Sequence, residues 1–236
     1  MRIAAFSDTR GFGLLTVLLW LSLLATTALG VALATSAEPP ATSALHDRLR
    51  LARAAESAVS LAVASLAAQA DWSLVPGAGV PSPFTDGAPG LRMVAGQPFD
   101  LVPETRQRTC GRVTPCDDAA TSIVAPGRPW GPRNPRWQLV VHVPLADVDA
   151  VAARACPCYL VAWVADDPAD ADGDPARDAP PGVEGHGVLL VRGAAVAGAG
   201  TLAEAEALVA QPCRRSNLPC GGSRVQSWGP VRDSVP

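Results

Sequence analysis

Aspartates crowd the segment 166–178, and their carboxylates are the side chains of this chain best suited to bind a metal ion. Calcium takes about six to eight oxygen ligands, and an Asp-x-Asp-Gly motif like the one ending at Gly173 begins many calcium loops. With Gly173 at the sixth position of an EF-hand, Pro168 and Ala179 would stand where the first and last carboxylates belong, so the loop is not an EF-hand. A solvated acidic loop between strands is the alternative, because clustered carboxylates repel one another unless they are solvated or metal-bound. The calcium ligands that the sequence predicts are Asp170, Asp172 and Asp174.

The six cysteines form the second group of reactive side chains. An even number of cysteines in an extracytoplasmic region indicates disulfides, and their spacing favours two local bridges across loops. The first predicted bridge joins Cys110 to Cys116, and the second joins Cys213 to Cys220. The remaining pair, Cys156 and Cys158, either bridges with strain or reaches distant cysteines. A zinc site is the other interpretation, but Cys-x-Cys is a poor ligand pair and no histidine is near.

The histidines, and the lack of any lysine, bear on whether this chain is an enzyme. His142 lies among the apolar residues Leu139–Val143 and is predicted to be a half-buried strand residue; the other histidines are His46 and His186. The chain has no Gly-x-Ser-x-Gly, His-Glu-x-x-His or glycine-rich phosphate motif. It has no lysine, which excludes Schiff-base chemistry and a P-loop. The sequence therefore indicates a protein that is not an enzyme and has no cofactor except the predicted calcium. A net charge of −3 without a basic patch argues against a nucleic-acid partner.

An apolar run from Phe12 to Ala37 carries no charged side chain. Roughly 20 apolar helical residues cross a bilayer core of about 30 Å, so the run is long enough to span a membrane. Arg2 and Arg10 precede it, and the positive-inside rule places them in the cytoplasm and the rest of the chain outside. A removable secretory peptide is the alternative, because Ala32-Leu33-Ala34 and Thr35-Ser36-Ala37 offer small-residue cleavage sites.

A second helix is predicted at residues 42–70, beginning at Thr42 or Ser43, because Pro39-Pro40 should kink or break the first one. Apolar residues recur there at three- and four-residue multiples and define one stripe, which consists of Leu45, Leu49, Ala52, Val59, Val63 and Leu66. We expect this helix to cover one face of a sheet, with Leu49, Val59, Val63 and Leu66 turned toward it.

Short apolar runs with strand character fill the region 71–236. They lie at Trp137–Val143, Tyr159–Ala165, Val188–Val196 and Leu202–Val209, with a weaker one at Arg224–Trp228. Leu202–Val209 has helix-favouring residues, but its regular alternation and the preceding turn Gly198-Ala199-Gly200 favour a strand in a hairpin. A helix followed by an antiparallel sheet is an α+β arrangement, with a disulfide-containing extracytoplasmic domain at residues 71–236.

Several segments of this chain resemble a known family. Arg10-Gly11-Phe12 is similar to a prepilin processing site, and Leu51–Ala58 resembles the Ala-Ala-Glu stretch of a pilin stalk helix. The family-like segments further on are Asp71-Trp72-Ser73, Pro129-Trp130-Gly131, Asn134–Trp137 and Ala162–Asp167. The chain thus resembles the PilX-type minor pilins and, more distantly, the large minor pseudopilin of type II secretion.

This resemblance implies a pilin-like fold and a fate in a filament. Residues 1–11 would be a leader that a prepilin peptidase removes between Gly11 and Phe12, with N-methylation of Phe12. Residues 12–37 would anchor the chain as a single-pass protein of the inner membrane. The same residues would then pack against other pilin subunits, in a pilus or at the cell surface.

Two features depart from the family's pattern. Thr16 stands where major pilins carry a glutamate that pairs with a neighbouring subunit's N-terminal amine, and this favours an accessory subunit over a bulk one. Pro39-Pro40 argues against a single unbroken stalk helix. The alternative function is a membrane-anchored or secreted disulfide-rich binding domain unrelated to pili.

Overall fold

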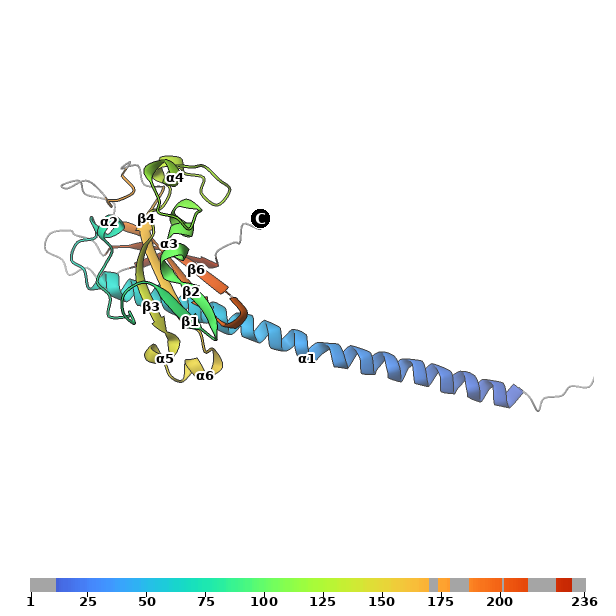
Figure 1. Ribbon diagram of the computed structural model, residues 1–236. Coiled ribbons are helices and arrows are strands. Elements are labelled where there is room, and N and C mark those ends of the chain that lie inside the picture. The colour runs from blue at the N-terminus through green and yellow to red at the C-terminus, as the bar shows by residue number, and fades with distance from the viewer. Residues whose placement is uncertain (1–11, 170–173, 179–186, 201, 212–223, 231–236) are drawn as a thin grey trace, which may run out of the picture. The chain divides into compact units, whose positions relative to one another are not determined.

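The computed structural model describes residues 12–169, 174–178, 187–200, 202–211 and 224–230 (Figure 1). The chain divides between Asp47 and Arg48 into two compact units, and each is described by itself. The first unit contains a long apolar helical segment, and the second contains an antiparallel sheet. The chain is therefore of the α+β class, as its sequence predicted.

Helix α1 runs from Phe12 to Ala67 and continues through Pro39-Pro40. The predicted break, with a new helix at Thr42 or Ser43, is therefore wrong. A proline inside a helix removes one backbone hydrogen bond and clashes with the preceding turn. Its ring nevertheless holds φ at about −65°, a helical value, so the backbone can stay helical. A kink at these prolines, the alternative to a break, stays a prediction, because residues 31–43 are described only as part of the helix.

One sheet of five antiparallel strands follows the chain order. Its members are β3 (Gln138–Pro144), β4 (Tyr159–Asp166), β5 (Val188–Val196), β6 (Leu202–Ala210) and β7 (Arg224–Pro230). All five predicted strands are present, and the alternating segment after Gly200 is a strand. Strands β5 and β6 form a hairpin around the 3-10 turn η2 (Gly198–Gly200), with Val196 opposite Leu202.

The end of α1 packs on one face of this sheet. Its buried residues are mostly small and consist of Leu51, Ala54, Ala55, Ala58, Val59, Ala62, Ser65 and Leu66. Gly193 of β5 lies against them: a Cβ atom added there would be 2.5 Å from the Ala55 carbonyl oxygen and 2.7 Å from Val59 Cγ2. Because glycine has no side chain, the helix backbone can approach β5 closely at this position.

The predicted apolar stripe of this helix is correct in part. Val59 and Leu66 are fully buried, and Val63 is partly buried against the same core. Leu49 is 53% exposed, so its predicted position against the sheet is wrong, and Leu45, also in the stripe, is 56% exposed. The prediction took the large apolar side chains as the contact surface of the helix. The buried surface instead includes the alanines of a neighbouring stripe, where the helix lies close to Gly193.

The other face of the sheet is covered by elements that the sequence analysis did not predict. They are helix α3 (Leu101–Cys110) and a hairpin of β1 (Leu91–Val94) and β2 (Gln97–Asp100). Asp100 begins α3 by accepting a hydrogen bond from the Val102 backbone N–H at 3.1 Å. Buried Trp163 of β4 donates its ring N–H to Thr105 Oγ1 at 2.8 Å, which joins α3 to the sheet.

Short helices complete the second unit. They are α2 (Val75–Ala78), α4 (Asp118–Thr121), η1 (Gly131–Arg133), α5 (Leu145–Val148) and α6 (Ala152–Ala155). The reversal after α1 is fixed by Trp72, which is buried and donates its ring N–H to the Leu66 carbonyl at 3.0 Å. The helix end and the sheet are thereby held in one core.

Candidate functional site

The apolar part of α1 is the first candidate for a functional surface. Residues Gly13–Gly30 have a mean hydropathy of 1.9, no residue buried in the structure, and enough length to cross a membrane. A signal sequence near an N-terminus meets the same criteria. The exposed large side chains are Leu14, Leu15, Val17, Leu18, Leu19, Trp20, Leu21, Leu23, Leu24 and Leu29.

The hydroxyl groups of this segment are bonded to their own helix. Thr16 donates to the Gly13 carbonyl and Ser22 to the Leu19 carbonyl, each at 2.9 Å. Thr26 and Thr27 likewise donate to carbonyls three and four residues earlier. An unsatisfied polar group in hydrocarbon costs several kcal/mol, so this internal bonding suits the segment to lipid or to a bundle of apolar helices.

The predicted processing site lies at the start of this helix. Gly11 falls outside the described residues, and Phe12 is the first residue of α1, with its side chain also outside them. Cleavage between these two residues and methylation of Phe12 stay predictions.

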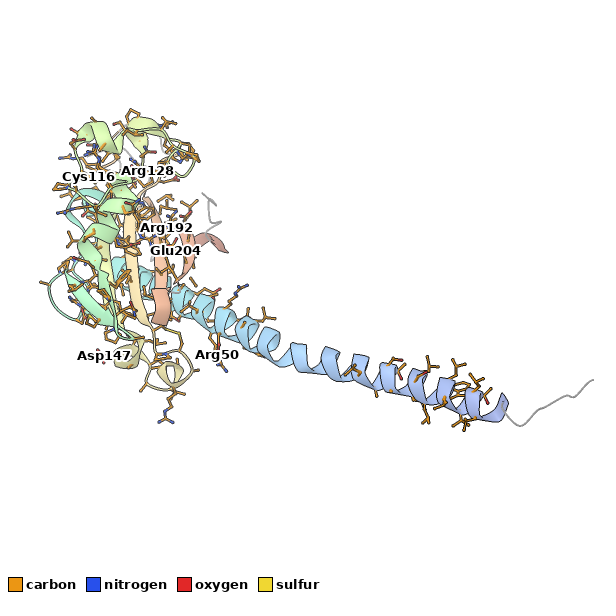
Figure 2. The ribbon with its side chains drawn as sticks, turned by 45° about the vertical axis from the view of Figure 1, so that its right-hand side comes forward. Arg50, Cys116, Arg128, Asp147, Arg192 and Glu204 are labelled. Carbon is orange, nitrogen blue, oxygen red and sulfur yellow. A yellow bond between two sulfur atoms is a disulfide. The ribbon has the colours of Figure 1, made fainter. Side chains whose placement is uncertain are left out.

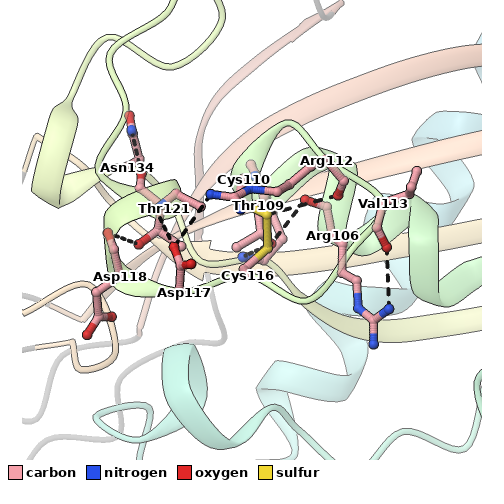
Figure 3. The surroundings of a disulfide bond; sticks show 12 residues. Arg106, Thr109, Cys110, Arg112, Val113, Cys116, Asp117, Asp118, Thr121 and Asn134 are labelled. Carbon is pink, nitrogen blue, oxygen red and sulfur yellow. Dashed lines mark hydrogen bonds and ion pairs between the residues drawn. A yellow bond between two sulfur atoms is a disulfide. The ribbon is translucent and has the colours of Figure 1, made fainter.

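A disulfide joins Cys110 to Cys116, the pairing that their spacing predicted, with Cα atoms 5.9 Å apart (Figure 3). It closes the turn after α3, where Gly111 takes a left-handed conformation at φ 74°. Beyond the bridge, Asp117 begins α4 by accepting the Ala120 N–H at 2.6 Å. The bridge thus fixes the exit from α3 and the entry into α4.

A second disulfide joins Cys156 to Cys158, with Cα atoms 5.3 Å apart. Of the two predicted alternatives, this is the bridge between the two neighbouring cysteines, so neither of them pairs with a distant cysteine. Cys213 and Cys220 lie outside the described residues, so their pairing stays a prediction.

The predicted calcium ligands fall mainly outside the described residues, which include neither Asp170 nor Asp172. Asp174 is described and exposed, and its carboxylate accepts the Ala176 N–H at 3.0 Å. Within the described part of the chain, no group of three or more His, Cys, Asp or Glu side chains is placed to hold a metal ion. Calcium binding is therefore still a prediction of the sequence.

The densest polar cluster of the second unit centres on Asp86. Its carboxylate accepts hydrogen bonds from Arg92 Nη2 at 2.8 Å, from the Tyr159 hydroxyl at 2.8 Å and from His142 Nδ1 at 3.0 Å. Burial alone would raise the pKa of Asp86, but these donors outweigh it and lower that pKa to about 2. The pKa of the Tyr159 hydroxyl is raised by burial and by the bond to Asp86.

This cluster ties a loop to the edge of the sheet. The His142 backbone N–H donates to the Phe84 carbonyl and its carbonyl accepts from the Asp86 N–H, each at 3.0 Å. The segment around Thr85 thereby covers the edge strand β3. His142 is more deeply buried than the predicted half-buried position, and its ring is held by a carboxylate. The arrangement is that of a structural clamp.

Sequence reasoning did not find this cluster, because its members are far apart in the chain. Asp86 stands 56 residues from His142 and 73 from Tyr159. The pairing of β3 with β4, which sets Pro144 opposite Tyr159, and the bonds between the loop at Phe84–Asp86 and the His142 backbone bring these side chains together. No local spacing could have signalled that contact.

A comparison with protein-family models, with curated proteins and with solved structures found no match for this chain.

Proposed function

We propose that this chain is a structural minor subunit of a type IV pilus or a related pseudopilus. It would be held in the inner membrane by residues 12–37 and inserted into the filament through the same residues. The observation that carries the proposal is the character of α1: its first part is uncharged and exposed, and the same helix ends in the core of a sheet domain.

The exposed apolar side chains of residues 13–30 support packing in an apolar helix bundle. Hydroxyls bonded within the helix allow this surface to leave lipid for a bundle without exposing an unsatisfied polar group. Thr16 supplies no carboxylate to a neighbouring N-terminal amine, which supports an accessory position over one in the bulk of the filament. The second unit would then lie outside the membrane, where disulfides persist.

The alternative is a membrane-anchored or secreted binding domain unrelated to pili. The small-residue sites at 32–34 and 35–37 favour it, because signal peptidase cleaves at such positions. The two disulfides of the second unit are as compatible with this alternative as with the pilus subunit.

The mature N-terminus distinguishes the two functions. We expect mass spectrometry of protein from the native host to find Phe12, methylated, as the first residue. Gly11→Val should leave the precursor uncut, whereas Gly30→Ala, where an added Cβ meets nothing within 4 Å, should be processed normally. A mature chain that begins at Thr35 or Glu38 would contradict the proposal, and an intact Met1 would favour a simple membrane anchor.

A further inference from the structure

A groove opens on the second face of the sheet, beside helix α3, where β5 and β6 are left uncovered. Its volume is about 490 Å³, within the range of small-molecule sites. The floor includes Leu190 and Arg192 of β5 and Glu206 of β6, and the walls include Trp130 and Asp167. Figure 2 shows Arg192 and Glu204 on the sheet and Arg128 in the upper part of the same unit.

Arg192 of β5 and Arg108 of α3 are already paired with carboxylates. Arg192 donates to Glu206, its cross-strand neighbour, through Nε at 3.0 Å, and its guanidinium lies 4.9 Å from the Trp137 ring. Arg108 pairs with Glu104 and Glu204 and stacks on buried Trp163. These residues form a rigid polar floor, because each charge is fixed by a carboxylate and an aromatic ring.

Two charged lining residues of the groove, Arg128 and Asp167, belong to neither of these ion-paired groups. Arg128 donates Nη2 to the backbone carbonyls of Ala120 and Thr121, and Asp167 accepts the Ala169 N–H at 3.0 Å. Neither side chain takes part in an ion pair among the described residues. Asp167 would repel an anionic ligand and Arg128 would repel a cationic one. The groove therefore suits a neutral ligand that both donates and accepts hydrogen bonds.

Trp130 adds an apolar surface to this polar groove. It is 41% exposed, and its backbone N–H donates to Asn134 Oδ1 at 3.0 Å. Asn134 is buried and donates to the carbonyls of Thr121 and Ile123 at 2.8 and 2.9 Å, which fixes the loop that carries the ring. The backbone that carries Trp130 is therefore fixed before any ligand arrives, and the Arg133 guanidinium lies 5.8 Å from the centre of its ring. Binding then need not order this loop.

We propose that this groove binds a neutral saccharide. A sugar ring has a flat C–H face that packs on an aromatic ring such as Trp130, and vicinal hydroxyls that bond to both guanidinium and carboxylate groups. Arg128 and Asp167 both line the groove and offer one guanidinium and one carboxylate, whose own charges cancel. The groove lies wholly within the second unit, so the proposal is independent of assembly into a filament.

Isothermal titration on the full chain in phospholipid nanodiscs tests this site; maltoside detergents are avoided because their sugar head groups would compete. The neutral probes are lactose, maltotriose and tri-N-acetylchitotriose. The negatively charged counterpart of lactose is 3′-sialyllactose. We expect at least one neutral probe to bind, and Trp130→Ala to weaken it about tenfold. Asp167→Asn should weaken it less. Met93→Ala removes an exposed apolar side chain outside the groove and should bind like the wild type.

Three results would overturn the proposal. They are no binding of any neutral probe, tighter binding of 3′-sialyllactose than of lactose, and equal binding by the wild type and Trp130→Ala. Near-ultraviolet circular dichroism of each variant separates loss of the site from loss of the fold.

Discussion

Residues 13–30 and residues 51–66 belong to the same helix, yet their apolar side chains differ in size. The first segment presents leucines that are more than half exposed, whereas the buried face of the second is mostly alanine. The buried face also comes close to β5: a Cβ added at Gly193 would be 2.5 Å from the Ala55 carbonyl oxygen, and Ala55 and Ala58 are themselves fully buried, so larger side chains there would have to displace their neighbours. Apolarity alone therefore does not identify the surroundings of a helix; the size of its apolar residues separates a lipid- or bundle-facing surface from close contact with a sheet.

The largest expected effect comes from charging the buried half of the helix. Val59→Asp would bury a carboxylate in the apolar contact with Gly193, and should lower the free energy of unfolding of the second unit by about 4 kcal/mol. Urea denaturation followed by tryptophan fluorescence measures it. Val59→Ala is the control for lost volume and should cost less. Equal stability of Val59→Asp and the wild type would disprove the packing of this face.

The same substitution in the other half should have a different consequence. Leu21→Asp places a charge near the middle of Gly13–Gly30, where it should disfavour membrane insertion by about 3 kcal/mol. Carbonate extraction of membranes measures the inserted fraction, with Leu21→Val as the control. The melting temperature of the second unit should not change, since residue 21 belongs to the first unit. A lower melting temperature would show that the two halves are not independent.

Sequence patterns predicted the regular elements of this fold well. Short apolar runs identified β3, β4, β5 and, more weakly, β7, whereas regular alternation identified β6, because the side chains of a half-buried strand repeat every two residues. The helical stripe was only half correct, since its position depends on Gly193, more than a hundred residues further along the chain. Helix α3 and the Asp86 cluster were missed for a related reason: their side chains acquire partners only when distant strands pair.

The Asp86 cluster tests whether the helix alone holds the sheet. Asp86→Asn removes the charge that Arg92, His142 and Tyr159 share, and should lower the free energy of unfolding by about 2 kcal/mol at neutral pH. Differential scanning calorimetry checks this value, with Asp147→Asn on the short helix α5 as a control carboxylate. If Asp86→Asn were as stable as the wild type, the contact of α1 with the sheet would suffice.

The pH dependence of the same cluster gives a separate prediction. The folded pKa of Asp86 is about 2, below its ordinary value of 3.8, so its stabilising contribution is present above about pH 4 and is lost as the pH falls through 2. That contribution is about 2 kcal/mol at neutral pH. The stability difference between the wild type and Asp86→Asn should therefore shrink between pH 4 and pH 2. Urea denaturation at each pH measures it, and a constant difference would show that the carboxylate is not the ionised centre of the cluster.

The smallest expected effect separates the predicted stripe from the observed one. Leu49 is apolar and one of the four residues predicted to face the sheet, yet it is more than half exposed. Leu49→Asp should therefore change the stability of the second unit by less than about 0.5 kcal/mol, since exposed substitutions away from special features have small effects. Val59→Asp, ten residues along the same helix, carries the identical charge into the core, so the pair isolates burial from helix propensity. A loss of several kcal/mol for Leu49→Asp would mean that this leucine is covered in the folded chain. In that case the larger apolar residues, not the alanines, would mark the contact surface of the helix.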